Sequence, residues 1–228
     1  MTNKWLKVAL MAAAIATGTS IKIDAETVLY VPQDDRPVSL QYTVDTAREA
    51  GMTILTPPQN LISGKNYQGQ ADQIMAWVEQ NAGRADVMVL STDTLIYGGL
   101  VDSRKHNIPL TTLESRLKRI ESLKARNKNV RIYGFGTVMR SPRASGGGTE
   151  PAYYAEYGPT IFQIAALQDK LDSGSLTQEE TQKLMSLQAS VPVEYLQDWF
   201  DRRQKNMKIN KELIDETRSG VFNYFALG

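Results

Sequence analysis

Three short apolar runs of this sequence are each followed by charged side chains whose chemistry suits proton transfer and ligand binding. The runs span residues 28–31, 87–90 and 130–135, and the charged residues that follow them are Asp34, Asp35, Arg36, Asp93, Arg104 and Arg140. If the runs are neighbouring parallel strands, their carboxyl ends meet at one edge of a sheet, where open α/β folds bind ligands. The spacing therefore predicts one shared polar site.

Paired carboxyl groups in an aromatic-rich chain favour a glycan-directed hydrolase. Glycosidic cleavage requires one carboxyl group as the acid and a second as nucleophile or base. We assign Asp93 as the general acid/base and Asp35 as its carboxylate partner. The other site residues would bind the substrate. Its hydroxyls would be held by Asp34, Tyr97 and Arg104, and an anionic substituent would be held by Arg36 and Arg140. Sugar rings would stack on tyrosines such as Tyr153, Tyr154 and Tyr157.

Two other functions remain open from the same residues. The chain would be a solute- or sugar-binding protein if the site performs no chemistry. It would be a metal-dependent hydrolase if Asp34, Asp35 and Asp93 hold Mg²⁺, Ca²⁺ or Mn²⁺ through oxygen. The leading hypothesis needs no cofactor and assigns no metal ligand. A purely local interpretation is also open, in which Asp34 or Asp35 pairs with Arg36 in a turn and Asp93 caps a helix.

Composition excludes several classes of site. The chain has 228 residues and no cysteine, so disulfides, thiolate catalysis and cysteine-based metal sites are excluded. The single histidine, His106, excludes a multi-histidine metal site, and we expect it on a surface loop. A net charge of +1 gives no electrostatic reason to expect a nucleic acid partner. We expect a small-molecule or glycan substrate, and the oligomeric state stays open.

The first 25 residues have the pattern of a signal peptide. Lys4 and Lys7 precede an apolar stretch at 8–18, and Ala25 offers a cleavage point. The apolar stretch is too short for a comfortable membrane span. We therefore expect export to the periplasm or the extracellular space, with no membrane span after cleavage.

Alternating short apolar runs and amphipathic runs predict an α/β fold with a parallel sheet. Between residues 26 and 150 we expect four strands, at 28–31, 52–55, 87–90 and 130–135. We expect helices at 42–50 and 71–81, and a third helix that begins at a capping box formed by Thr111 and Glu114. The pattern fits either a partial β/α barrel or a doubly wound sheet.

The remainder of the chain is predicted to be helical. We expect helices at 160–171, 177–188 and 193–218, the second opened by a capping box of Thr177 and Glu180. Residues 151–220 would form a subdomain or lid inserted near the C-terminus. Residues 221–228 resemble the start of a further strand, which suggests a truncated chain.

Two motifs carry a resemblance to a known family. The segments 31–38 (VPQDDRPV) and 90–104 (LSTDTLIYGGLVDSR) resemble the signature stretches of the DUF4127 family, bacterial proteins named for having no assigned function. Members are longer and continue into further acidic motifs, which implies that this chain is an N-terminal portion and that part of the site lies beyond it. Gln33 replaces the usual aliphatic residue, which we interpret as a surface change. The resemblance implies no reaction.

Overall fold

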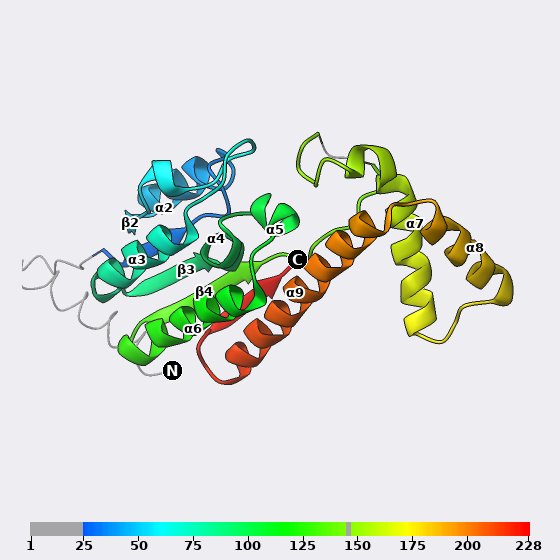
Figure 1. The fold of residues 1–228 in the computed structure, drawn as a ribbon. Helices are drawn as coiled ribbons and strands as arrows, with labels where there is room; N and C mark the ends of the chain where they lie inside the picture. Colours follow the sequence, from blue (N-terminus) through cyan, green and yellow to red (C-terminus); the bar gives the residue numbers. More distant parts are fainter. Residues whose placement is uncertain (1–24, 145–146) are drawn as a thin grey trace, which may run out of the picture.

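One parallel sheet organises the fold (Figure 1). Its strands are β1 (Thr27–Val31), β2 (Thr53–Leu55), β3 (Val87–Ser91), β4 (Arg131–Gly136) and β5 (Tyr224–Leu227). The computed structural model describes residues 25–144 and 147–228, so residues 1–24 of the predicted leader lie outside the described residues. All the strand pairs described are parallel, and the order across the sheet is β2-β1-β3-β4-β5. The α/β prediction is confirmed.

The strand order decides between a barrel and an open sheet. In a β/α barrel each strand neighbours the next one along the chain. Here β1 lies between β2 and β3, pairing Val28 with Ile54 on one side and with Val87 on the other. The order is that of a doubly wound sheet, in which the chain turns back at β1. The barrel alternative is therefore wrong.

Helices cover the two faces of the sheet unequally. On one face pack α3 (Ala71–Asn81), α6 (Leu110–Arg126) and α9 (Val193–Arg218), and the opposite face carries α2 (Gln41–Glu49) against β2. The main core lies under the first three helices, and its fully buried members include Leu29, Met88, Ile132, Ile74, Ile120 and Ile209. Strand side chains alternate between faces, which leaves Val28 and Tyr30 on the α2 side.

The C-terminal helices form a second core. α7 (Tyr154–Asp172) and α8 (Gln178–Ala189) pack with the first turns of α9 around Trp199, whose ring centroid lies 4.4 Å from that of Tyr154. At about 1.5 Å per residue, α9 is about 39 Å long and reaches from this cluster back to the sheet (Figure 1). The predicted capping box of Thr177 and Glu180 is present. Within the described residues, no helix has both the length and the apolar character to cross a bilayer.

Local predictions fail at two places. The box of Thr111 and Glu114 is wrong: α6 follows Pro109 without a side-chain cap, and Glu114 instead pairs with Lys208 of α9. The segment after β3 contains two short helices that were not predicted, α4 (Thr92–Tyr97) and α5 (Asp102–Lys105). Short 3₁₀ turns also occur at η1 (Gln59–Leu61) and η2 (Ala82–Arg84). The helices α4 and α5 matter because they position the predicted site residues.

Candidate functional site

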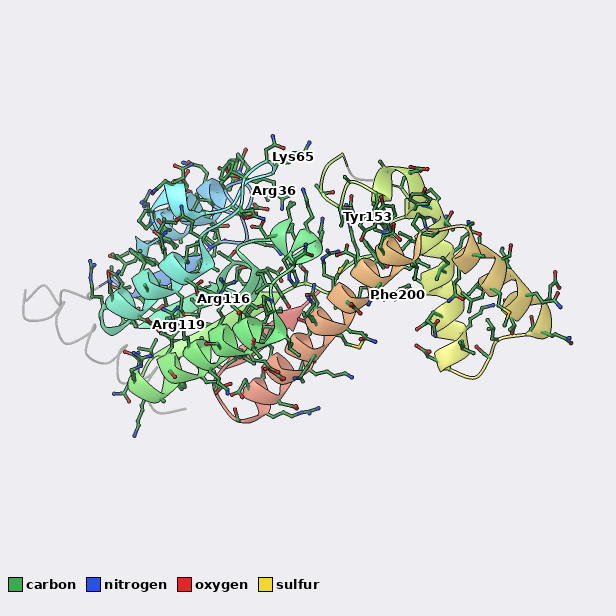
Figure 2. All side chains as sticks on the ribbon, in the orientation of Figure 1. Arg36, Lys65, Arg116, Arg119, Tyr153 and Phe200 are labelled. Atoms are coloured by element: carbon green, nitrogen blue, oxygen red, sulfur yellow. The ribbon has the colours of Figure 1, made fainter. Side chains whose placement is uncertain are left out.

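The predicted site residues lie around the carboxyl edge of the sheet, where β1 and β3 end. Connections from β1 and from β3 leave this edge toward opposite faces, and such a switch point is where doubly wound sheets bind ligands. Helix α5 and the segment leading into α7 lie at the same end (Figure 1). Figure 2 places Arg36 and Lys65 there, with Tyr153 across from them at the start of α7.

The turn after β1 separates its two carboxylates. Asp34 is buried and accepts hydrogen bonds from Arg36, at 2.8 Å from Nε and 3.2 Å from the backbone N–H, with an ion pair at 2.7 Å. Asp35 is half-buried and accepts a hydrogen bond from the hydroxyl of Tyr67, in the loop after η1. The local-pair interpretation therefore applies to Asp34 and Arg36, and Asp35 stays outside that pair.

Asp93 is buried in the first turn of α4, which Ser91 caps by accepting a hydrogen bond from the Thr94 N–H at 3.3 Å. Its Oδ2 accepts hydrogen bonds from Gln33 Nε2 at 3.0 Å and from Thr137 Oγ1 at 2.8 Å, and its Oδ1 accepts one from the Thr137 N–H at 3.4 Å. This carboxyl group thus joins the ends of β1, β3 and β4.

Burial raises the pKa of Asp93 above its usual value of 3.8, against the hydrogen bonds from Gln33 and Thr137 and the charge of Arg104, which all lower it. From the sequence alone, we interpreted Gln33 as a surface change. That interpretation is wrong, because Gln33 is half-buried and binds this carboxyl group.

Two arginines lie near this edge: Arg104 of α5, whose charge acts on Asp93, and Arg140 of the segment after β4, whose charge acts on Arg104. Arg140 donates from Nε to Glu150 at 3.0 Å and from Nη2 to Thr149 at 3.1 Å, and Glu150 is only 2% exposed. Arg104 is half-buried, and the charges of Arg140, Glu150, Asp93 and Arg36 all act on it. Residues from three strand ends therefore share one electrostatic environment. Glu150 was not foreseen, since it lies beyond a glycine run with no strand beside it.

Tyr97 and His106 are in the interior, which corrects both predictions. Tyr97 is 6% exposed and stacks on His106 with ring centroids 4.9 Å apart, so it does not present its hydroxyl to a substrate. His106 Nδ1 accepts the Ile108 N–H at 3.2 Å, which leaves Nε2 to donate to Asn206 Oδ1 at 2.8 Å. Burial lowers the pKa of His106 to about 4, and the ring is neutral at pH 7. The partner is 100 residues away in sequence, on α9.

The tyrosines of α7 are also used internally. Tyr154 is fully buried beside Trp199, and Tyr153 stacks on Tyr195 with centroids 4.7 Å apart. The aromatic side chain at the site is instead Tyr67, which is 51% exposed and bonded to Asp35. Its position depends on a loop contact that no local pattern predicts.

Glycines beside the site pack against protein. Asp102 Oδ2 accepts the Gly69 N–H at 3.1 Å, which holds the η1 loop against α5. A Cβ on Gly69 would lie 2.0 Å from the Gly98 carbonyl oxygen, and one on Gly99 would lie 1.8 Å from Ser63 Oγ. The pair at 98–99 therefore serves loop packing, not the close approach of a ligand.

The ligand set proposed for a metal is not assembled. Across residues 25–144 and 147–228, no group of three or more acidic or histidine side chains is placed to hold a metal ion. Asp34, Asp35 and Asp93 thus have separate partners and no common centre. A hollow of about 730 Å³ between α7 and α9, lined in part by Phe162, Phe200 and Arg203, contains none of the predicted site residues (Figure 2 labels Phe200).

Comparison with known proteins gives one match. The sequence profile described as "Protein of unknown function (DUF4127)" matches residues 28–228, from the first strand through the last. No curated protein and no solved structure matches the chain. The matched range includes every charged residue of the strand-end site, and the resemblance seen in the two motifs is confirmed. The chain belongs to the DUF4127 family.

Proposed function

We propose that the carboxyl edge of the sheet is the active site of a glycan-directed hydrolase. The observation that carries the proposal is the contrast between two carboxyl groups at this edge. Asp93 is buried, with a pKa raised by desolvation, whereas Asp35 is half-exposed beside an exposed aromatic ring. Carboxyl groups in such different environments suit the separate roles of acid and base.

In this proposal Asp93 donates its proton to the glycosidic oxygen as the bond to the anomeric carbon breaks. The Asp35 carboxylate either attacks the anomeric carbon or takes a proton from the attacking water, depending on the separation of the two groups in the complex. Tyr67 offers a face on which a sugar ring can stack. Its hydroxyl already binds Asp35, so ring and carboxylate are positioned together.

Access to Asp93 requires a local movement. The side chain is 2% exposed, and Gln33 and Thr137 cover it through their hydrogen bonds. Gln33 holds Asp93 by one bond of 3.0 Å from a half-buried amide. A substrate oxygen that replaces this amide would meet the protonated carboxyl group directly. Export, which we also propose from the leader pattern, would bring such an enzyme to glycans outside the cytoplasm.

Replacing the second carboxylate tests the proposal. We expect Asp35→Asn to reduce hydrolysis by about 10²- to 10⁴-fold, because an amide neither attacks the anomeric carbon nor accepts a proton from water. The measurement is product release from a panel of glycans, followed by mass spectrometry. Asp45→Asn on α2 is the control, since within the described part of the chain Asp45 bonds only to Gln41 and Arg48. Hydrolysis by Asp35→Asn at the wild-type rate, or no product from any glycan with the wild type, would refute the proposal.

A binding protein is the second candidate, favoured by one observation. Both carboxylates of the site already accept hydrogen bonds, Asp35 from Tyr67 and Asp93 from Gln33 and Thr137. Groups held in this way can recognise a sugar without reacting. Calorimetry that detects sugar binding, combined with the absence of any product, would favour this candidate over the hydrolase.

A further inference from the structure

Arg104 differs from the other two arginines of the edge in its hydrogen bonding. Arg36 is paired with Asp34, and Arg140 is paired with the buried Glu150. For the Arg104 guanidinium, in contrast, the described part of the chain provides neither a hydrogen-bond acceptor nor an ion-pair partner. A guanidinium has five N–H donors in a planar fork, and this residue is partly buried.

Charged side chains near Arg104 also affect its guanidinium. Among these charges, the cation Arg140 has the largest effect on the pKa of Arg104, and it lowers that pKa. The anions Glu150 and Asp93 raise the pKa by less, and the cation Arg36 lowers it by the smallest amount. Burial and these like charges lower the pKa of Arg104, although a guanidinium stays protonated in proteins. Arg104 is thus a cation at the proposed site on which the charges of Glu150 and Asp93 act, but which no carboxylate among the described residues binds directly.

Helix α5 holds Arg104 in this position. The next residue, Lys105, donates from Nζ to the Gly148 carbonyl at 3.0 Å, which connects α5 to the segment before α7. On the opposite side, Asn206 of α9 donates to the Ser103 carbonyl at 2.8 Å. The backbone before Arg104 is therefore held to α9, and the Lys105 side chain after it reaches the segment before α7, so a ligand that binds Arg104 meets a residue on a supported helix.

We propose that Arg104 recognises an oxyanion on the substrate, so that the substrate class is an acidic sugar carrying a carboxylate or a phosphate. From the sequence alone, we expected Arg36 and Arg140 to bind an anionic substituent and Arg104 to bind hydroxyls. We now assign the oxyanion to Arg104, because Arg36 and Arg140 already have carboxylate partners. A planar fork binds either oxyanion through two parallel hydrogen bonds. The inference rests on the proposed site and names its ligand.

Binding measurements test this inference without depending on turnover. The probes are methyl glucuronide, glucose 6-phosphate and the neutral methyl glucoside, titrated by calorimetry into the full-length protein. We expect the wild type to bind at least one acidic probe about 10- to 100-fold more tightly than methyl glucoside, the range expected for charge-assisted hydrogen bonds. The probe with the larger preference distinguishes the carboxylate from the phosphate.

Three variants complete the test. Arg104→Gln should lose most of the preference, and Arg104→Lys should keep part of it. Arg218→Gln should keep all of it, because Arg218 lies at the far end of α9 and, among the residues that the structure describes, pairs only with Asp215. Equal binding of all three probes by the wild type, or an unchanged preference in Arg104→Gln, would overturn the inference. If the inference about Arg104 fails in this way but the protein still hydrolyses neutral glycans, the proposed hydrolase function remains. Failure of the inference is therefore distinguishable from failure of the proposed function.

Discussion

Asp93→Asn is expected to reduce glycan hydrolysis by about 10²- to 10⁴-fold while the protein stays folded. The amide has no acidic proton to give to the leaving oxygen. Its shape preserves the local hydrogen bonds, since the Asn oxygen can accept the Thr137 N–H, and the Gln33 amide can flip to accept from the Asn nitrogen. Turnover measured on the glycan panel, with circular dichroism on the same samples, checks both parts of this prediction.

Asp86→Asn provides the matched control for this variant. Asp86 accepts the Thr27 N–H at 2.8 Å at the opposite edge of the same sheet, so the identical chemical change occurs away from the site. It should leave hydrolysis at the wild-type rate. If Asp93→Asn is folded and hydrolyses glycans as fast as Asp86→Asn, then Asp93 is a structural carboxyl group and no acid.

Gly69→Ala is expected to lower the free energy of unfolding by about 2–3 kcal/mol, the upper part of the range for overpacked sites. The added Cβ would lie 2.0 Å from the Gly98 carbonyl oxygen and 3.0 Å from the Ser63 nitrogen. Both neighbours are backbone atoms, so the η1 loop must move as a unit to relieve the overlap. Because Tyr67 belongs to this loop, its bond to Asp35 should weaken as well.

Urea denaturation measures this effect, with Gly83→Ala as the control. Gly83 lies in η2, and a Cβ built there meets no atom within 4 Å. The control should therefore change the free energy of unfolding by no more than about 0.5 kcal/mol, as surface substitutions usually do. Equal midpoints for the two variants would mean that the loop is not held tightly against α4.

Much of the fold could be predicted because apolar patterning is a local property of the sequence. The strand at 87–90 reads as a continuous apolar run, and the helix at 71–81 has its predicted bounds. The order of the strands could not be predicted this way. The strand order depends on which face of the sheet each crossover helix covers. The local sequences of β1 and β2 do not determine that face.

The candidate site was predicted less completely, because burial depends on partners far away in sequence. Tyr97 was expected to face a ligand, but it packs on His106, which α9 covers through Asn206. Likewise, Tyr67 approaches Asp35 across 32 residues. Local charge patterns placed Asp34 and Arg36 in the same turn. They left open whether the two residues pair with each other or with a ligand, and only the structure shows that they pair with each other.

The proton on Asp93 is the central claim, and a titration of that carboxyl group tests it most directly. With ¹³C-labelled aspartate, the carboxyl resonance of Asp93 is assigned by its loss in Asp93→Asn and followed against pH. We expect a midpoint above 3.8, because burial outweighs the donors Gln33 and Thr137 and the charge of Arg104. The acid is then available below that midpoint and lost as pH rises through it. A midpoint at or below 3.8 would show a carboxylate stabilised by its donors and would contradict the account.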